Sequence, residues 1–230
     1  MKQVNKIAEP NSLLQHRAKQ HSNFDNIPYE TKTELRQSLL SEQGYICCYC
    51  MKRIPEKIEK EGIVTYNMKV EHFQCQESFS ALQLTYTNLF AACTGNEGKP
   101  QKLQTCDSKK GNLELSINLT VNLPNCETLF KYNAIGEISS TNDNADIDRQ
   151  LIVILNLNMQ TLKDGRSEIY LAVQEKIRVE GKRFKNDKAR FIRFLEQEKV
   201  KWLGRLENKH RPYCMVAVYF LTKKLKQNQN

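Results

Sequence analysis

The segment from Cys47 to Cys106 decides how this chain is interpreted. It opens with Cys47-Cys48-Tyr49-Cys50 and then contains, in order, Glu71-His72, Asn88, Cys93 and Cys106. The 230 residues include only four histidines. Cysteine pairs on both sides of one acid–histidine pair indicate a zinc-stabilised frame around a single reactive imidazole.

The four cysteines Cys47, Cys50, Cys93 and Cys106 are the predicted ligands of a structural zinc ion. Tetrahedral zinc is usually held by two close pairs of ligands from distant segments. Here the second pair is separated by twelve residues, but an insertion can extend from a metal knuckle without moving its ends. Such a site would contribute on the order of 10 kcal/mol to folding. The alternative is that they are small buried hydrophobic residues, the role predicted for the other cysteines, Cys48, Cys75, Cys126 and Cys214.

His72 is the predicted catalytic residue. Near neutral pH an imidazole can take a proton from water, which is the task of a general base in phosphodiester hydrolysis. A divalent ion such as Mg²⁺ or Mn²⁺, held by Glu71, would neutralise the phosphate and the leaving oxygen. Successive side chains of a strand point to opposite faces, so a strand end or a kink must bring both residues to one site. The alternative is a surface glutamate beside a core histidine.

Three further residues complete the predicted site. Asn88 could hydrogen-bond the backbone or the ring of His72 and fix its orientation, although alone it would be interpreted as a turn residue. Asp107 is a candidate second ligand of the catalytic metal, and also a candidate helix N-cap. Lys110, like Lys109, could contact phosphate, and a solvated face is the alternative for both.

Positive charge is concentrated in the last third of the chain. The net charge is +9, and residues 160–230 hold 18 Lys and Arg against 8 Asp and Glu, whereas the rest of the chain is close to neutral. A basic face beside the chemical half of the chain suits a polyanionic substrate, because neutralised phosphates release counterions. A solvated helix surface is the alternative.

The pattern along the chain predicts an α+β fold that is mostly helical, and 40% hydrophobic residues suffice for a sizeable core. The predicted parts are an N-terminal arm (1–28), a nuclease domain with the zinc site (29–132) and a basic helical domain (147–230), separated by a polar junction over 133–146. Helices are predicted over 30–43, 147–155, 168–180, 188–207 and 212–226, and strands over 63–66 and 69–73. Gly44 stands where a helix C-terminal glycine is expected.

No signal peptide or membrane span is predicted. The N-terminus lacks an apolar segment, and no run of about 18 apolar residues occurs. The cysteines are therefore interpreted as thiols and metal ligands in a reducing cytoplasm rather than as disulfides.

These residues resemble the HNH endonucleases, whose ββα-metal motif places a histidine base beside a metal-binding acid. The matching positions are Glu71-His72, Asn88, and Asp107 within Cys106-Asp107-Ser108-Lys109-Lys110-Gly111-Asn112. Many relatives carry His or Asn at the last metal-binding position. The resemblance therefore leaves Asn112 as the alternative to Asp107.

The chain is most similar in pattern to one subfamily, the HNH nuclease subunit of the Septu anti-phage system and its retron-associated relatives. The similarity covers nearly the whole chain, and it departs at Cys75, where relatives often have proline. The shared segments are Lys6-x-x-Glu9-Pro10-x-x-Leu13, Leu40-x-Glu42-Gln43-Gly44-x-x-Cys47-x-Tyr49-Cys50, Glu71-His72-Phe73, Tyr86-x-Asn88-Leu89-x-x-x-Cys93, and Leu155-Asn156-Leu157-Asn158 with Leu162 and Arg166.

This resemblance implies a toxic effector that works with a partner ATPase, with a retron reverse transcriptase and noncoding RNA as further partners. The leading hypothesis is a one-metal phosphodiesterase that cleaves DNA or RNA, including a structured RNA such as tRNA. A zinc-stabilised binding or assembly subunit without catalysis is the alternative.

Overall fold

The computed structural model describes residues 1–56, 58–60, 63–120 and 124–229. It combines helices with small antiparallel strand pairs. The helices are α1 (Asn11–Arg17), α2 (Tyr29–Glu42), α3 (Cys106–Lys110), α4 (Ala145–Arg149), α5 (Gln160–Arg183), α6 (Lys188–Leu203) and α7 (Cys214–Gln229). The paired strands are β1 (Ile58–Lys60) with β2 (Ile63–Thr65), β3 (Lys69–His72) with β4 (Leu89–Ala92), β5 (Phe130–Tyr132) with β6 (Ile138–Ser140), and β7 (Arg205–Leu206) with β8 (Lys209–His210).

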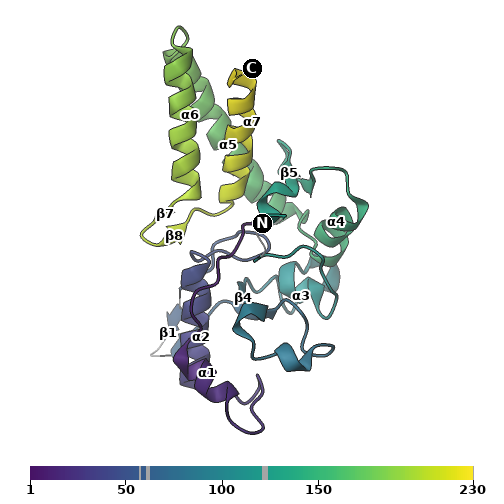
Figure 1. The fold of residues 1–230 in the computed structure, drawn as a ribbon. Helices are drawn as coiled ribbons and strands as arrows, with labels where there is room; N and C mark the ends of the chain where they lie inside the picture. The colour runs from purple at the N-terminus through teal and green to yellow at the C-terminus, as the bar shows by residue number, and fades with distance from the viewer. Residues whose placement is uncertain (57, 61–62, 121–123, 230) are drawn as a thin grey trace.

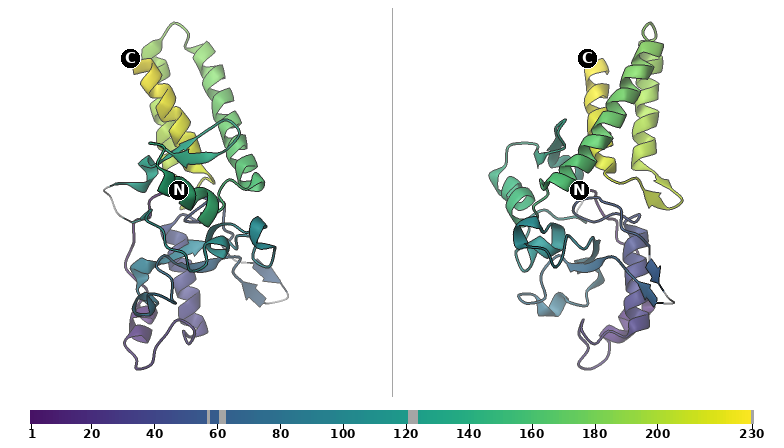
Figure 2. Two further views of the ribbon diagram at one scale, coloured as in Figure 1. Left: turned by 90° about the vertical axis from the view of Figure 1, so that its right-hand side faces the viewer. Right: turned by 180° about the vertical axis from the view of Figure 1, so that it is seen from behind.

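The molecule is elongated. Helices α5, α6 and α7 form a bundle that projects from a lower part holding α1, α2, α3 and the β3–β4 pair (Figure 1). The N-terminus lies between the two parts, and the views from the side and from behind show the same arrangement (Figure 2). No helix in the described ranges is long and apolar enough to cross a membrane.

Helix α2 forms as its sequence predicts. Its apolar positions Leu35, Leu39 and Leu40 are buried, and the helix ends at Glu42. Gly44 then takes a left-handed conformation with φ of +58°, while the amide of Tyr45 donates to the carbonyl oxygen of Leu40 at 2.8 Å. This is the conformation that favours glycine at a helix C-terminus.

Side chains at the end of α2 hold this helix to the opening segment and to the strand β4. The carboxylate of Glu42 is paired with Lys6 at 2.5 Å and accepts a hydrogen bond from Tyr86 at 2.8 Å. Next to it, the amide group of Gln43 both donates to and accepts from the backbone of Ala91, at 2.8 Å each way. The N-terminal segment is therefore tied through Lys6 to the end of α2.

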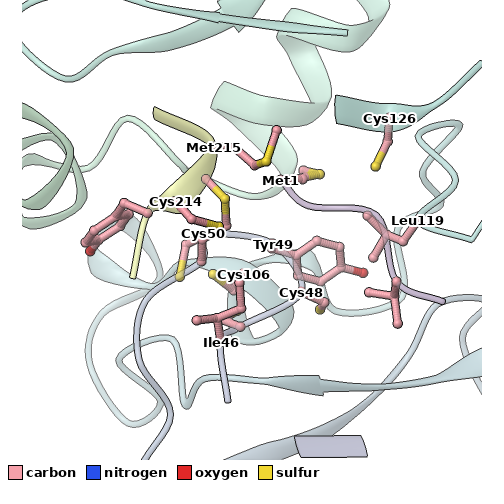
Figure 3. Packing of buried hydrophobic residues seen from close by; sticks show 14 of the residues in the cluster. Met1, Ile46, Cys48, Tyr49, Cys50, Cys106, Leu119, Cys126, Cys214 and Met215 are labelled. Carbon is pink, nitrogen blue, oxygen red and sulfur yellow. The ribbon is translucent and has the colours of Figure 1, made fainter. Parts of the chain in front are cut away.

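One hydrophobic core runs through both parts of the molecule. Met1, Cys214 and Met215 belong to the same buried cluster as Ile46 and Tyr49, as Figure 3 shows. The start of α7 is also tied to the cysteine knuckle by the backbone, because the amide of Tyr213 donates to the carbonyl oxygen of Met51 at 3.0 Å. The helical bundle is thus anchored on the segment that carries the cysteines.

The second half of the chain differs from its sequence prediction in four places. The predicted helix over 147–155 is α4 followed by a π-helical turn, Gln150–Ile154. The polar junction contains strand β6, and the expectation of helix throughout the rest was wrong at the hairpin β7–β8. Helix α5 is longer than predicted, because its polar first turns hide the apolar period. The boundaries 1–28, 29–132 and 147–230 stay a prediction.

Candidate metal and catalytic site

The four predicted zinc ligands come together. The sulfur atoms of Cys47, Cys50, Cys93 and Cys106 all lie within 4.8 Å of one another, and those of Cys50 and Cys93 are 3.8 Å apart. A tetrahedral ion with Zn–S bonds of about 2.3 Å requires sulfur atoms about 3.8 Å apart. Three of the four side chains are buried, and Cys93 is half-buried. The donor set and its spacing fit a closed structural zinc site.

The first pair is shaped by a tight turn of the backbone. The amide of Cys47 donates to the carbonyl oxygen of Lys52, and the amide of Met51 donates back to the carbonyl oxygen of Cys47, at 2.9 and 3.0 Å. The amide of Lys52 points at the sulfur of Cys50 at 3.4 Å. An N–H group directed at sulfur stabilises the thiolate form that a metal requires.

The second pair is closed by a loop whose ends meet. Cys93 directly follows β4, Cys106 begins α3, and the amide of Thr105 donates to the carbonyl oxygen of Gly95 at 2.9 Å. The amide of Cys106 is in turn held by the carbonyl oxygen of Leu155 at 2.9 Å. The twelve intervening residues therefore extend outward without separating the two cysteines, as the sequence predicted.

The thiols of the cluster shift one another's pKa values. Burial opposes ionisation of Cys47, yet hydrogen bonds from the thiols around it hold its pKa well below the usual range. Hydrogen bonds with Cys47, Cys50 and Cys93 raise the pKa of Cys106. One thiolate is thus stabilised at the expense of its neighbours, and a divalent cation would allow all four to ionise. The other cysteines, Cys48, Cys75, Cys126 and Cys214, are buried in the core as expected.

Glu71 lies beside this cluster with one carboxylate oxygen unsatisfied. Its Oε1 accepts a hydrogen bond from the phenol of Tyr49 at 2.7 Å and pairs with the ammonium of Lys110 at 2.9 Å. Its Oε2 is buried and has no hydrogen-bond partner among the described residues. Burial, together with the carboxyl group of Asp107 next to it, raises the pKa of Glu71 well above the usual range.

Asp107 supplies the second carboxylate. It lies in the first turn of α3, one residue after the fourth cysteine, and pairs with Lys69 at 2.8 Å. Burial opposes its ionisation, but its contacts with Glu71 and Lys69 lower its pKa. Two adjacent carboxyl groups, one with a buried oxygen that lacks a donor, are a donor set that suits a divalent cation. The expected helix cap was wrong, because Thr105 holds the N-cap position.

His72 closes β3 and is 8% exposed. Its Nε2 lies 3.0 Å from the carbonyl oxygen of Gln83. Its ring packs edge to face with that of Phe24, with the two ring centroids 4.5 Å apart. Because a carbonyl oxygen can only accept, Nε2 carries the proton and Nδ1 keeps its lone pair. Burial lowers the pKa of His72, so the ring is neutral at pH 7. The strand end allows the backbone of His72 and the carboxylate of Glu71 to share one contact, the ammonium of Lys110.

Asn88 holds the loop that follows His72 rather than the histidine itself. Its side chain accepts from the amide of Gln74 at 2.8 Å and donates to the carbonyl oxygens of Gln74 and Leu82 at 3.0 and 3.2 Å. The backbone oxygen of Asn88 accepts from the amide of Phe73 at 2.9 Å. A single side chain therefore closes the loop between β3 and β4, which carries the carbonyl group that fixes the imidazole.

Lys110 is buried rather than on a solvated face, since it is 2% exposed. Its contact with phosphate stays a prediction. Its ammonium pairs with Glu71 and donates to the carbonyl oxygen of His72 at 3.1 Å. Asn112, the alternative metal ligand, is exposed and its amide donates to Glu77. Asp107 is therefore the residue that the fold places beside Glu71.

Two site residues were not found by the analysis of the sequence alone. Tyr49 was noted only as part of a shared motif, although it lies between Cys47 and Cys50 of the four-cysteine cluster and its phenol contacts Glu71. Lys69 bridges Asp107 and Glu97, with its ammonium 3.1 Å from the latter carboxylate. Its position two residues before Glu71, on the same face of a strand, is the signal that could have identified it.

Comparison with known proteins supports a nuclease. No protein-family model matches the chain. A protein of Escherichia coli named "Retron Ec83 putative HNH endonuclease" is 25% identical over an alignment of 209 residues, which covers 74% of this chain and 79% of that protein. The chain is a distant relative of that protein. The similarity supports the predicted HNH nuclease with a relation to retron systems.

Proposed function

We propose that this protein is a metal-dependent HNH endonuclease that hydrolyses phosphodiester bonds in DNA or RNA. The observation that carries the proposal is the pair of carboxyl groups of Glu71 and Asp107, one with a buried oxygen that has no hydrogen-bond partner among the described residues. His72 follows Glu71 at the end of the same strand, with its Nε2 held by the carbonyl oxygen of Gln83. The name of the relative from Escherichia coli supports the same reaction class. In this proposal β3, β4 and α3 form the ββα-metal core.

His72 would act as the general base. The carbonyl oxygen of Gln83 holds the Nε2–H, so the lone pair of Nδ1 is the one available to accept a proton. Water would lose a proton to Nδ1 as its oxygen bonds to phosphorus, while the bond from phosphorus to the leaving oxygen breaks and that oxygen takes a proton from solvent. Asn88 contributes by holding the loop on which Gln83 lies.

Glu71 and Asp107 would hold the catalytic Mg²⁺ or Mn²⁺. A bound divalent ion neutralises negative charge on the phosphate and on the leaving oxygen. Lys110 limits the charge that burial of Glu71 would otherwise leave uncompensated. The four cysteines would hold zinc in a structural role. Two of these cysteines are direct sequence neighbours of residues at the catalytic site: Cys50 follows Tyr49, and Cys106 precedes Asp107.

The biological setting is inferred from resemblance. The retron in the name of the relative favours a toxic effector of an anti-phage defence system. By the resemblance to the Septu nuclease subunit and its retron-associated relatives, its partners would be an ATPase, and a reverse transcriptase with its noncoding RNA. DNA and RNA, including tRNA, are both candidate substrates.

The decisive experiment is the substitution His72→Gln. The side-chain amide of glutamine can still donate to the carbonyl oxygen of Gln83, but it cannot accept a proton at neutral pH. We expect cleavage of plasmid and of total RNA to fall by about 100-fold or more, with zinc content and melting temperature unchanged. The exposed His21, substituted by Asn, is the matched control. Full cleavage by the His72→Gln protein would favour the alternative, a zinc-stabilised nucleic-acid-binding or assembly subunit without its own catalysis.

A further inference from the structure

The end of the helical bundle carries most of the unbalanced charge of the chain. Residues 176–193, which comprise the end of α5, the turn that connects it to α6 and the start of α6, hold eight Lys and Arg and only two acidic residues. This connection forms the end of the bundle that lies farthest from α1 and β4 (Figures 1 and 2). The positive charge therefore lies at a distance from Glu71, His72 and Asp107, and the proposed catalytic site does not account for it.

A hollow of about 580 Å³ opens on one side of this connection, where α5, α6 and the end of α7 meet. Its floor is apolar, and includes Ile177, Phe184 and Phe191. Five cationic residues and no acidic residue line it: Arg178, Lys182, Lys185, Lys188 and Lys224. We call the exposed face formed by these five cations the hairpin-tip surface.

Most of this charge is not neutralised within the protein. Arg178 pairs with Glu175 at 2.6 Å, but no ion pair is formed by the four lysines of the surface within the described ranges. Lys182, Lys185 and Lys188 are exposed. Like charges held close together repel one another, so such a cluster lowers stability slightly unless an anion is bound to it.

The cationic face continues around Phe184. This half-buried ring lines a second hollow of about 540 Å³ on the other side of the hairpin. There Glu180 and Glu198 accompany five cations, Lys176, Arg183, Arg190, Arg193 and Lys201. Glu180 pairs with Arg183 at 3.5 Å, and Glu198 pairs with Lys176 and Lys201. The excess of positive charge is therefore greatest on the hairpin-tip surface, and it extends past the ring rather than forming a closed pocket for one small anion.

We propose that the hairpin-tip surface binds the phosphodiester backbone of a nucleic acid at a distance from the site of cleavage. Several cations around an open hollow can contact more than one phosphate of a strand, and phosphate contacts position a nucleic acid without reading its sequence. The apolar floor offers a surface for sugars or for an unstacked base. The proposal takes its ligand class from the proposed nuclease function, but it does not require His72 to be catalytic.

Binding can be tested separately from cleavage. In the His72→Gln background, Lys182, Lys185 and Lys188 are changed together to Gln, and the control changes the exposed Lys19, Lys99 and Lys102 to Gln. Both variants lose the same formal charge. Affinity for fluorescent single-stranded RNA, single-stranded DNA and duplex DNA is then measured by anisotropy at several salt concentrations.

We expect the tip variant to bind about tenfold or more weakly than its control. The slope of log K against log salt should fall by about 2.7 for a duplex and about 2.1 for a single strand, as the loss of three phosphate contacts requires. Equal affinities and slopes in the two variants would overturn the proposal. Binding of both variants to phosphatidylserine vesicles and to a polyglutamate peptide is measured as well. The proposal would also be overturned if the tip variant lost binding only to the vesicles or only to the peptide, because the ligand would then be a membrane or an acidic protein.

Discussion

The phenol of Tyr49 donates a 2.7 Å hydrogen bond to the carboxylate of Glu71. Tyr49 lies between two cysteines of the metal cluster, and Glu71 is the proposed ligand of the catalytic ion. Cys106, the fourth cysteine of the cluster, directly precedes Asp107, the other proposed ligand of that ion. The two proposed metal sites therefore share backbone, so order in the four-cysteine cluster would determine the positions of the groups proposed to surround the catalytic ion.

The substitution Tyr49→Phe tests this relationship. It keeps the buried ring and removes only the donor to Glu71, so the zinc site should remain intact. A hydrogen bond to a charged group is worth about 1.5 kcal/mol, and its loss should weaken Mn²⁺ binding roughly tenfold. Electron paramagnetic resonance titration of Mn²⁺ measures this, with zinc content determined in parallel. The exposed Tyr29, changed to Phe, is the control, and an unaltered Mn²⁺ affinity in the Tyr49→Phe protein would show that the contact does not support the ion.

Loss of one cysteine of the cluster should lower zinc content and make the melting temperature independent of a chelator. Cys93→Ala removes a sulfur atom from the cluster, whereas Cys75→Ala removes a buried thiol outside it. We expect the Cys93→Ala protein to contain less than one equivalent of zinc and to melt at the same low temperature with or without a chelator, because bound zinc contributes on the order of 10 kcal/mol. The Cys75→Ala protein should keep its zinc and remain sensitive to chelation. Mass spectrometry of the metal content and thermal melts provide the measurement, and zinc retention by Cys93→Ala would contradict the assignment.

Gly95 and Gly98 lie in the same loop, but a larger residue would be opposed for different reasons at the two positions. At Gly98 only the positive φ opposes it, whereas at Gly95 a close neighbour does so as well. Both have positive φ, +56° and +78°. A Cβ at Gly95 would lie 2.1 Å from the carbonyl oxygen of Thr105, the residue before the fourth cysteine, whereas one at Gly98 would meet nothing within 4 Å. Gly98→Ala should therefore cost only the conformational penalty of about 1–2 kcal/mol. Gly95→Ala should cost more and should also weaken zinc binding, as measured by chelator competition. Equal effects of the two substitutions would mean that the loop can move away from Thr105.

The sequence predicted those features whose causes are local or are imposed by a metal. The apolar period and the terminal glycine of α2 act within the helix itself, and the cysteine spacing allows only a few ways to enclose one ion. The position of Lys110 could not be found in the same way. A lysine is assumed to be exposed, and the partner that draws it inward, Glu71, is distant in sequence and comes next to it only when the cluster closes.

The hairpin β7–β8 was missed for a different reason. Its turn residues, Glu207 and Asn208, both have positive φ, as the type I′ turn of a two-residue hairpin requires. Of the two, only asparagine favours this conformation. The strands have two residues each, too short for an alternating pattern. The hairpin is held instead by tertiary contacts, since Arg205 donates to the carbonyl oxygen of Ser41 at 2.9 Å.

His210, in β8, should make stability depend on pH. Burial is the main cause that lowers its pKa to about 4. The ring is held neutral, because its Nε2 accepts from the guanidinium of Arg205 and its Nδ1 lies near the carbonyl oxygen of Gly204, both at 3.3 Å. Protonation of Nε2 would remove the acceptor for the guanidinium of Arg205 and place a positive charge next to that guanidinium.

The unfolded chain binds this proton near pH 6.5, whereas the folded protein does so only near pH 4. The stabilising contribution of His210 is therefore complete above pH 6.5, declines as pH falls from 6.5 to 4, and changes no further below 4. The substitution His210→Asn removes this titration. In urea unfolding, the difference in free energy of unfolding between wild type and His210→Asn should shrink steadily over that interval, while losses of zinc common to both proteins cancel. A constant difference from pH 7.5 to 5 would mean that His210 titrates alike in the folded and unfolded states.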